Sequence, residues 1–285
     1  MLRISIGTKL EHKTLGPCRV TAIARGGKYF FVSFSSGAPS GQFASASAEQ
    51  YFSPPDALLD KFGLRKAAPA DVRPLLEAVD RGDTTKGLEL VTALDRLKEF
   101  SAVDRICRRL KSLGLELDYF LLLKQAKALR RLVGRAEDAV TVASDALTHA
   151  DNKKRQSIAR TVRAAAWVDL GKLDDAEGDC RKALEESPDS PHPYRVMGKV
   201  FVLRSNYEKA DKCFEAGAVR DPEGRNDILV VYKDRVERLC KEGKAGEIEQ
   251  IREHIGKRWP PELAARAFKE IEAVLSHGYY SHSNE

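Results

Sequence analysis

Most of the chain has its apolar residues at the spacing of amphipathic helices. From residue 71 onward they recur three and four positions apart, and short polar or glycine-containing breaks interrupt the runs. The predicted helices are Asp71–Arg81, Thr85–Glu99, Ser101–Leu113, Leu117–Val133, Arg135–His149, Lys154–Leu170, Leu173–Glu186, His192–Arg204, Tyr207–Val219, Asn226–Glu242, Ala245–Arg258 and Pro260–Ser276. Helices joined by such short breaks are expected to pack as antiparallel pairs.

The first 52 residues follow a different, two-residue period. Arg19–Ala24 and Tyr29–Phe34 are predicted strands, Gly26-Gly27 is a turn signal between them, and Gly41–Ala44 is a further short strand. Short strands with tight turns predict a small β-barrel over residues 1–52. Prolines then end the strand pattern, so residues 53–70 are predicted to be a linker that includes a short helix at Asp56–Phe62.

Two stretches of the helical part align with each other at a spacing of about 34 residues, a period typical of helix–turn–helix repeats. Ala176, Ala183 and Pro188 are each followed, one period later, by Ala210, Gly217 and Pro222. Small residues at fixed places and a closing proline indicate stacked helix–turn–helix units, which bury their apolar faces on one another.

The second of these units resembles the tetratricopeptide repeat (TPR) through Tyr194, Met197, Gly198, Phe201, Ala210, Phe214, Gly217 and Pro222. The unit before it keeps the small residues, but it has Arg160 and Arg163 where apolar residues are usual, which predicts that its first helix is rotated or shifted. The predicted fold class is mainly α. A TPR-like α-α superhelical solenoid spans residues 71–276, with its clearest repeats at 117–222, and a small SH3/Tudor-like β-barrel precedes it. Residues 277–285 are predicted to be a flexible tail.

The N-terminal segment carries a second resemblance. Gly7, His12, Gly16 and Val20, followed by Val32-Ser-Phe-Ser-Ser-Gly, resemble a Tudor/SH3-like module. That module is found at the C-terminus of UvrD-type DNA helicases and, more distantly, in CarD-type transcription factors. The resemblance implies docking on RNA polymerase or beside nucleic acid. The alternative is that the glycines and His12 only build the first turn of the barrel.

Charge supports a docking role for this segment. The chain has a net charge of +6, and residues 1–66 hold nine basic and four acidic residues, so most of the excess lies there. Such asymmetry favours contact with nucleic acid or an acidic protein surface. The candidate docking residues are Lys9, Lys13, Arg25, Lys28 and Tyr29. An aromatic ring among basic side chains suits base stacking with phosphate contact, but it is equally typical of a half-buried hairpin edge.

In TPR arrays the first helix of each pair lines a groove that takes peptides, and the resemblance carries this to five residues. They are His192, Arg195, Lys199, Asn226 and Lys233. Their cations would form a basic stripe suited to acidic groups of a protein partner. Ordinary solvated helix positions are the alternative.

No catalytic motif accompanies these features. The sequence has neither a phosphate-binding loop nor a Gly-x-Ser-x-Gly elbow, and its five cysteines and six histidines lack metal-ligand spacing. We therefore expect no enzyme activity, no cofactor and no metal. No apolar run reaches the roughly 18 residues of a membrane span and no signal peptide is evident, which predicts a cytoplasmic protein. The predicted function is a non-enzymatic adaptor that binds protein partners. The alternative is a nucleic-acid-binding accessory factor.

Overall fold

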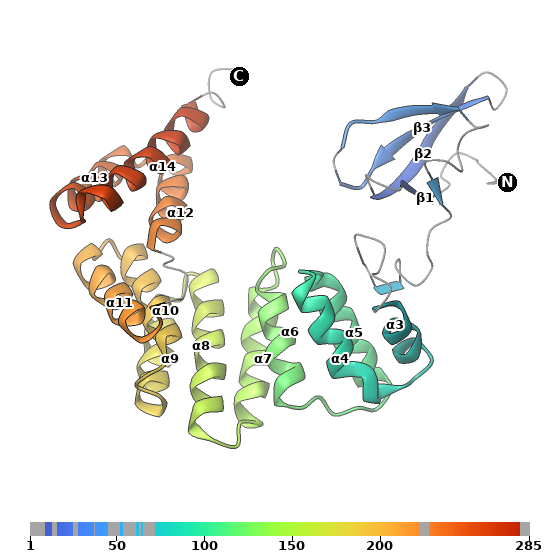
Figure 1. Cartoon of the computed structure of the whole chain (residues 1–285), viewed down its shortest axis with the longest axis horizontal. Coiled ribbons are helices and arrows are strands. Elements are labelled where there is room, and N and C mark those ends of the chain that lie inside the picture. The colour runs from blue at the N-terminus through green and yellow to red at the C-terminus, as the bar shows by residue number, and fades with distance from the viewer. Residues whose placement is uncertain are drawn as a thin grey trace. The chain divides into compact units, whose positions relative to one another are not determined.

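The protein is mainly helical, with one small antiparallel sheet near the N-terminus, as the sequence predicts (Figure 1). The computed structural model describes residues 9–12, 16–24, 28–36, 38–44, 52–53, 61–62, 64, 72–222 and 228–279. The chain divides into two compact units, Met1–Val133 and Gly134–Glu285.

The sheet of the first unit has five strands in the order β4-β3-β2-β1-β5, and all neighbours are antiparallel. The strands are β1 (Lys9–His12), β2 (Gly16–Ala24), β3 (Tyr29–Phe34), β4 (Gly41–Ala44) and β5 (Phe52–Ser53). β3 and β4 have the predicted bounds, whereas β2 begins earlier than predicted and β1 and β5 were not predicted. Alternate residues point into the sheet's core, which consists of Leu10, Cys18, Val20, Phe30, Val32 and Phe34.

The register between β2 and β3 shifts once. Val20 lies opposite Val32, but Ala22 lies opposite Phe31, so Thr21 has no partner in the ladder. The Thr21 hydroxyl donates instead to the backbone carbonyl of Phe31 at 3.3 Å. This β-bulge keeps Phe30 and Val32 inside the core on β3 while the facing strand gains one residue.

Four α-helices with described bounds follow in the first unit. They are α3 (Arg73–Asp80), α4 (Gly87–Arg96), α5 (Phe100–Ser112) and α6 (Tyr119–Leu129), with a 3₁₀ helix η2 (Thr84–Lys86) before α4. The predicted helix Thr85–Glu99 therefore starts as a 3₁₀ turn and ends early, because Lys98 adopts a left-handed φ of 60°. Of the short helix predicted at Asp56–Phe62, only residues 61 and 62 are described, and both are helical.

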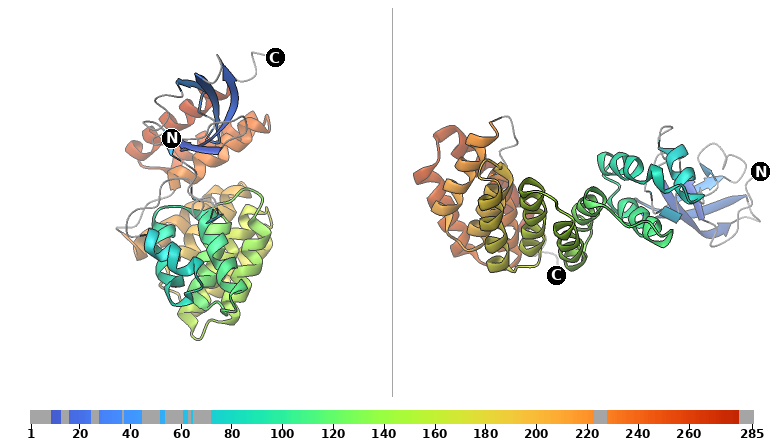
Figure 2. Two further views of the ribbon diagram at one scale, coloured as in Figure 1. Left: turned by 90° about the vertical axis from the view of Figure 1, so that its right-hand side faces the viewer. Right: turned by 90° about the horizontal axis from the view of Figure 1, so that it is seen from below.

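The second unit contains eight helices among its described residues. They are α7 (Ala136–Thr148), α8 (Lys153–Asp169), α9 (Leu173–Glu186), α10 (Pro191–Leu203), α11 (Tyr207–Arg220), α12 (Ile228–Lys241), α13 (Ala245–Arg258) and α14 (Pro261–Tyr279). α8 packs against α9, α9 against α10 and α10 against α11, and Figures 1 and 2 show these helices from three directions. The turn from α8 to α9 uses Gly171 at a φ of 74°, and the turn from α10 to α11 uses Ser205, at the same place in the next repeat, at a φ of 56°. The repeat in sequence is thus also a repeat in backbone conformation.

Side-chain packing follows the same period. A Cβ atom on Gly198 would lie 2.7 Å from the ring of Phe214, so only glycine lets α10 and α11 approach this closely. In the preceding pair the equivalent residues are Ala164 and Cys180, both fully buried. The pair α10–α11 thus combines the smallest residue with a large ring, whereas the pair α8–α9 combines two small residues.

The last three helices close the second unit with a larger apolar core. Tyr232, Val236 and Leu239 of α12 pack with Ile251 and Ile255 of α13. This cluster also takes in Phe201 of α10 and Phe214 of α11, so the final helices continue the same core. Among the described residues, the structure has no helix both long and apolar enough to cross a membrane.

Candidate protein-binding face

The helices of the second unit alternate between two positions. α10 packs against both α8 and α12, and α12 packs against α14. α9, α11 and α13 follow α8, α10 and α12 as the second helices of their pairs, and α9 also packs against α10. We call the exposed side of the first helices the α8–α10–α12 face. It is where the TPR resemblance expects a peptide.

The structure places four of the five predicted groove residues on described helices. His192, Arg195 and Lys199 lie on α10 and Lys233 lies on α12, while Asn226 lies outside the described residues. His192 is exposed, and Arg195 and Lys199 are half-buried.

Two of the three predicted cations have carboxylate partners within the unit. Arg195 donates to Asp221 at 2.8 Å, and Lys233 donates to Glu270 of α14 at 2.8 Å. The hydrogen bond to Glu270 raises the pKa of Lys233. Lys199 has no ion-pair partner among the residues that the structure describes. The face is therefore less basic than its sequence suggests.

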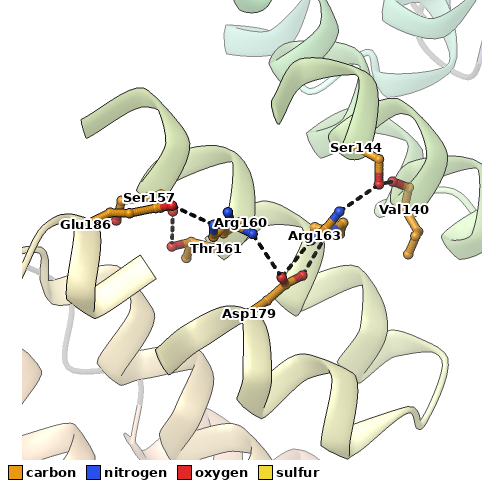
Figure 3. Close-up of polar contacts among 8 residues, drawn as sticks. All are labelled: Val140, Ser144, Ser157, Arg160, Thr161, Arg163, Asp179 and Glu186. Atoms are coloured by element: carbon orange, nitrogen blue, oxygen red, sulfur yellow. Dashed lines mark hydrogen bonds and ion pairs between the residues drawn. The ribbon is translucent and has the colours of Figure 1, made fainter. Parts of the chain in front are cut away.

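A buried polar network lies beside this face and joins α7, α8 and α9 (Figure 3). Arg163 donates two hydrogen bonds of 2.7 Å to the carboxylate of Asp179 and a third, of 3.0 Å, to the hydroxyl of Ser144. Arg160 donates to Glu186 at 2.7 Å and lies 3.8 Å from Asp179. The bidentate bond to Asp179 raises the pKa of Arg163. These partners accommodate the two arginines that depart from the repeat pattern.

A second polar cluster, which the sequence did not reveal, joins α11, α12 and α13. The carboxylate of Asp211 accepts from the Tyr232 hydroxyl at 2.8 Å and from the Trp259 indole at 3.0 Å, and it lies 2.8 Å from His254 Nε2. Burial, followed by the charge of Asp211, raises the pKa of Tyr232. Asp211 is 21 residues from Tyr232 and 43 from His254, so no local spacing in the sequence indicates this cluster.

In the N-terminal sheet only some of the candidate docking residues are described. Lys28 is exposed beside β3, and Tyr29 is half-buried and lies opposite Ala24 of β2 and Ala44 of β4. Lys9 belongs to β1 by its backbone, whereas Lys13 and Arg25 lie outside the described residues.

The described part of the fold offers little chemistry beyond these polar clusters. Within the described ranges, no group of three His, Cys, Asp or Glu residues is arranged to hold a metal ion. The five cysteines all lie in the described residues and none of them forms a disulfide, and burial raises the pKa of the Cys107 thiol to about 12. A thiol with a raised pKa is a poor nucleophile.

Comparison with known proteins gives structural neighbours only. No protein-family model matches the chain, and no curated protein matches its sequence. Among solved structures, YrrB, described as a TPR protein with an unusual peptide-binding site, is 15% identical with a TM-score of 0.45, covering 58% of this chain and 86% of its own. MamA is 14% identical with a TM-score of 0.41, covering 71% and 96%. A tetratricopeptide repeat protein from Parabacteroides merdae is 16% identical with a TM-score of 0.36, covering 75% and 93%.

Proposed function

We propose that this protein is a non-enzymatic adaptor that binds protein partners through the α8–α10–α12 face. The observation that carries the proposal is the way the helices behind this face are fixed. The Arg163–Asp179 network joins α7 to α9, and the Asp211 cluster joins α11 to α13. A face held by such buried bonds loses little conformational entropy on binding, which is the advantage of a preorganised scaffold.

The charges of the face favour an acidic group on the partner at one position. Arg195 and Lys233 already have carboxylates within 2.8 Å. Lys199 lacks one among the described residues and lies between them in sequence, so a carboxylate from a partner would meet its ammonium group. His192, seven residues earlier on α10, lies on the same side of the helix and adds a hydrogen-bonding group.

The test is a comparison of captured partners between two charge reversals. The full chain, Lys199→Glu and Lys182→Glu are immobilised and exposed to lysate from the source cells, and bound proteins are quantified by mass spectrometry. Lys182 is exposed on α9, away from the first helices, and serves as the matched control. Partners that depend on the face should be lost with Lys199→Glu and kept with Lys182→Glu. Equal retention by both variants would refute the assignment of this face.

The N-terminal sheet supports a second candidate function, that of a nucleic-acid-binding accessory factor. Lys28 and Tyr29 are adjacent at the start of β3, and the segment around them carries the basic excess of the chain. The same surface would serve docking on transcription, repair or helicase machinery, as the resemblance implies. The test is fluorescence anisotropy of labelled DNA and RNA with the full chain and with its Lys28→Glu and Tyr29→Ala variants across a salt series. It distinguishes nucleic-acid binding from protein docking. Nucleic-acid binding should weaken steeply with salt and in both variants. Salt-independent binding, or none, leaves protein docking.

A further inference from the structure

The helices of the first unit carry a separate exposed surface with a regular composition. One side of α4 and one side of α6 each hold three residues spaced four and three positions apart, which places each set on one helix face. The two sets are Leu88, Thr92 and Asp95 on α4, and Phe120, Lys124 and Lys127 on α6. Lys124 donates to Asp95 at 2.7 Å, so the two sets lie next to each other. We call this surface the α4–α6 face.

One end of the α4–α6 face is apolar. Leu88 is 40% exposed and Phe120 is 46% exposed, although both are large hydrophobic residues. Leu88 precedes Asp95 on α4 and Phe120 precedes Lys124 on α6, so each apolar residue lies nearer the N-terminus of its helix than the ion pair. Because α5 runs back between them, α4 and α6 point the same way and the two apolar side chains share one end of the face. Two large exposed apolar side chains at one end of a face indicate a contact surface more than a single one does.

The other end of the face has surplus positive charge. Lys127 lies one turn beyond Lys124, and Asp95 already serves Lys124. The pKa of Lys127 is lowered, first by desolvation from surrounding protein atoms and then by repulsion from Lys124, although the side chain keeps an exposed surface. Arg130 adds to the repulsion, and Asp95 only partly offsets it. A bound anion would relieve this crowding.

We propose that the α4–α6 face binds a short acidic peptide segment of a partner protein, with an apolar anchor on Leu88 and Phe120 and a carboxylate at Lys127. The inference rests on the proposed protein-binding function but uses a different surface. A nucleic acid fits less well, since its evenly spaced phosphates need several unneutralised cations. Here Asp95 occupies the middle of the face and the apolar end offers no cation.

The experiment is a subtractive selection from a random dodecapeptide phage library on the full chain. The library is first depleted on the double variant Phe120→Ser/Lys127→Glu and then selected on the unchanged protein, so that peptides for any other surface are removed. Depletion on Val133→Ser/Lys111→Glu is the matched control. Val133 is fully exposed and Lys111 is exposed on α5, so that variant should remove every binder. Circular dichroism establishes that both variants are folded.

We expect surviving peptides to combine apolar residues with glutamate or aspartate, and to bind the Phe120→Ser/Lys127→Glu chain at least about tenfold more weakly by anisotropy. No survivors, or survivors without acidic residues, would overturn the inference. So would loss of oligonucleotide binding in the same variant when no peptide survives. If no peptide survives, but peptides retained in the depletion step bind all three chains equally and are weakened by Lys199→Glu, the proposed function is sustained while this inference fails.

Discussion

The bond between Arg163 and Asp179 gives the sharpest test of how the second unit is held together. The Asp179 side chain is 7% exposed and that of Arg163 is 21% exposed. Removing one partner of a fully buried pair costs about 3–5 kcal/mol, because the other charge is left desolvated. Arg163 retains some solvent and Arg160 lies 3.8 Å from Asp179, so we expect about 2–3 kcal/mol for Arg163→Met or Asp179→Ala alone.

The double variant should recover most of this loss. The next repeat places Met197 and Cys213 at the equivalent positions, and both pack against its apolar core. Arg163→Met/Asp179→Ala imitates that arrangement and leaves no buried charge behind. Arg160 keeps Glu186, and Ser144 keeps its bond to the Val140 carbonyl. We therefore expect a favourable coupling energy of at least about 2 kcal/mol between the two sites.

The assay is urea unfolding of the full chain, followed by far-ultraviolet circular dichroism for all four proteins of the cycle. The exposed pair Lys212–Glu208 on α11 is the control, since its side chains are 72% and 60% exposed. Its coupling should not exceed about 0.5 kcal/mol. Additive effects at Arg163 and Asp179, within about 0.5 kcal/mol, would refute the argument that the pair acts as one buried unit.

Three further predictions concern packing, pH and thiols. Gly198→Ala should destabilise the protein by about 1 kcal/mol, because overpacking against Phe214 outweighs the better helix propensity of alanine. Gly178→Ala should stabilise it by about 0.5–1 kcal/mol, because a Cβ atom there would have no atoms within 4 Å. Thermal melts that shift both variants in the same direction would contradict this. The pKa of Glu177 is lowered by Arg181 and then by Arg204, so Glu177→Gln should be less stable than the unchanged protein at pH 7. This difference in stability should vanish as the pH falls from 4.5 through the lowered pKa of Glu177. Urea midpoints measured across this pH range test the prediction. Because burial raises the pKa of Cys107 to about 12, a thiol-reactive chromogen at pH 8 should modify this residue slowly in the folded protein and rapidly in guanidinium.

Elements bounded by local signals were predictable to the residue. Leu173–Glu186 and Ala245–Arg258 coincide with α9 and α13, and Tyr29–Phe34 coincides with β3. Each has a clear period and a turn residue next to it, so short-range patterns contain the necessary information. β5, by contrast, consists of two residues that pair with β1 some forty residues earlier, and such pairing leaves no trace in a local pattern.

The electrostatics of the candidate site show the same division. The positions of Arg195, Lys199 and Lys233 on the first helices follow from the repeat. Their partners do not, because Asp221 is 26 residues from Arg195 and Glu270 is 37 residues from Lys233. A cation on a helix face is available to a ligand only when the fold brings no carboxylate to it. That condition depends on which helices pack together. The sequence can therefore identify candidate cations, but it cannot tell which of them are available to a ligand.

Residues that depart from the repeat pattern are an exception to this limit, because they are visible in the sequence and indicate where a partner must lie. Arg163 stands where the next repeat has Met197, and Asp179 stands where it has Cys213. A lone arginine among apolar positions would be costly to bury, so its presence implies a partner. The partner of Arg163 is Asp179, which lies sixteen residues later on the paired helix and is itself a departure from the repeat pattern. Paired departures at one repeat therefore predict a contact across its helices. The bonds that fix the helices do not involve Lys199, which has no ion-pair partner among the described residues. Under the proposed function, substitutions of Lys199 should therefore alter binding more than stability.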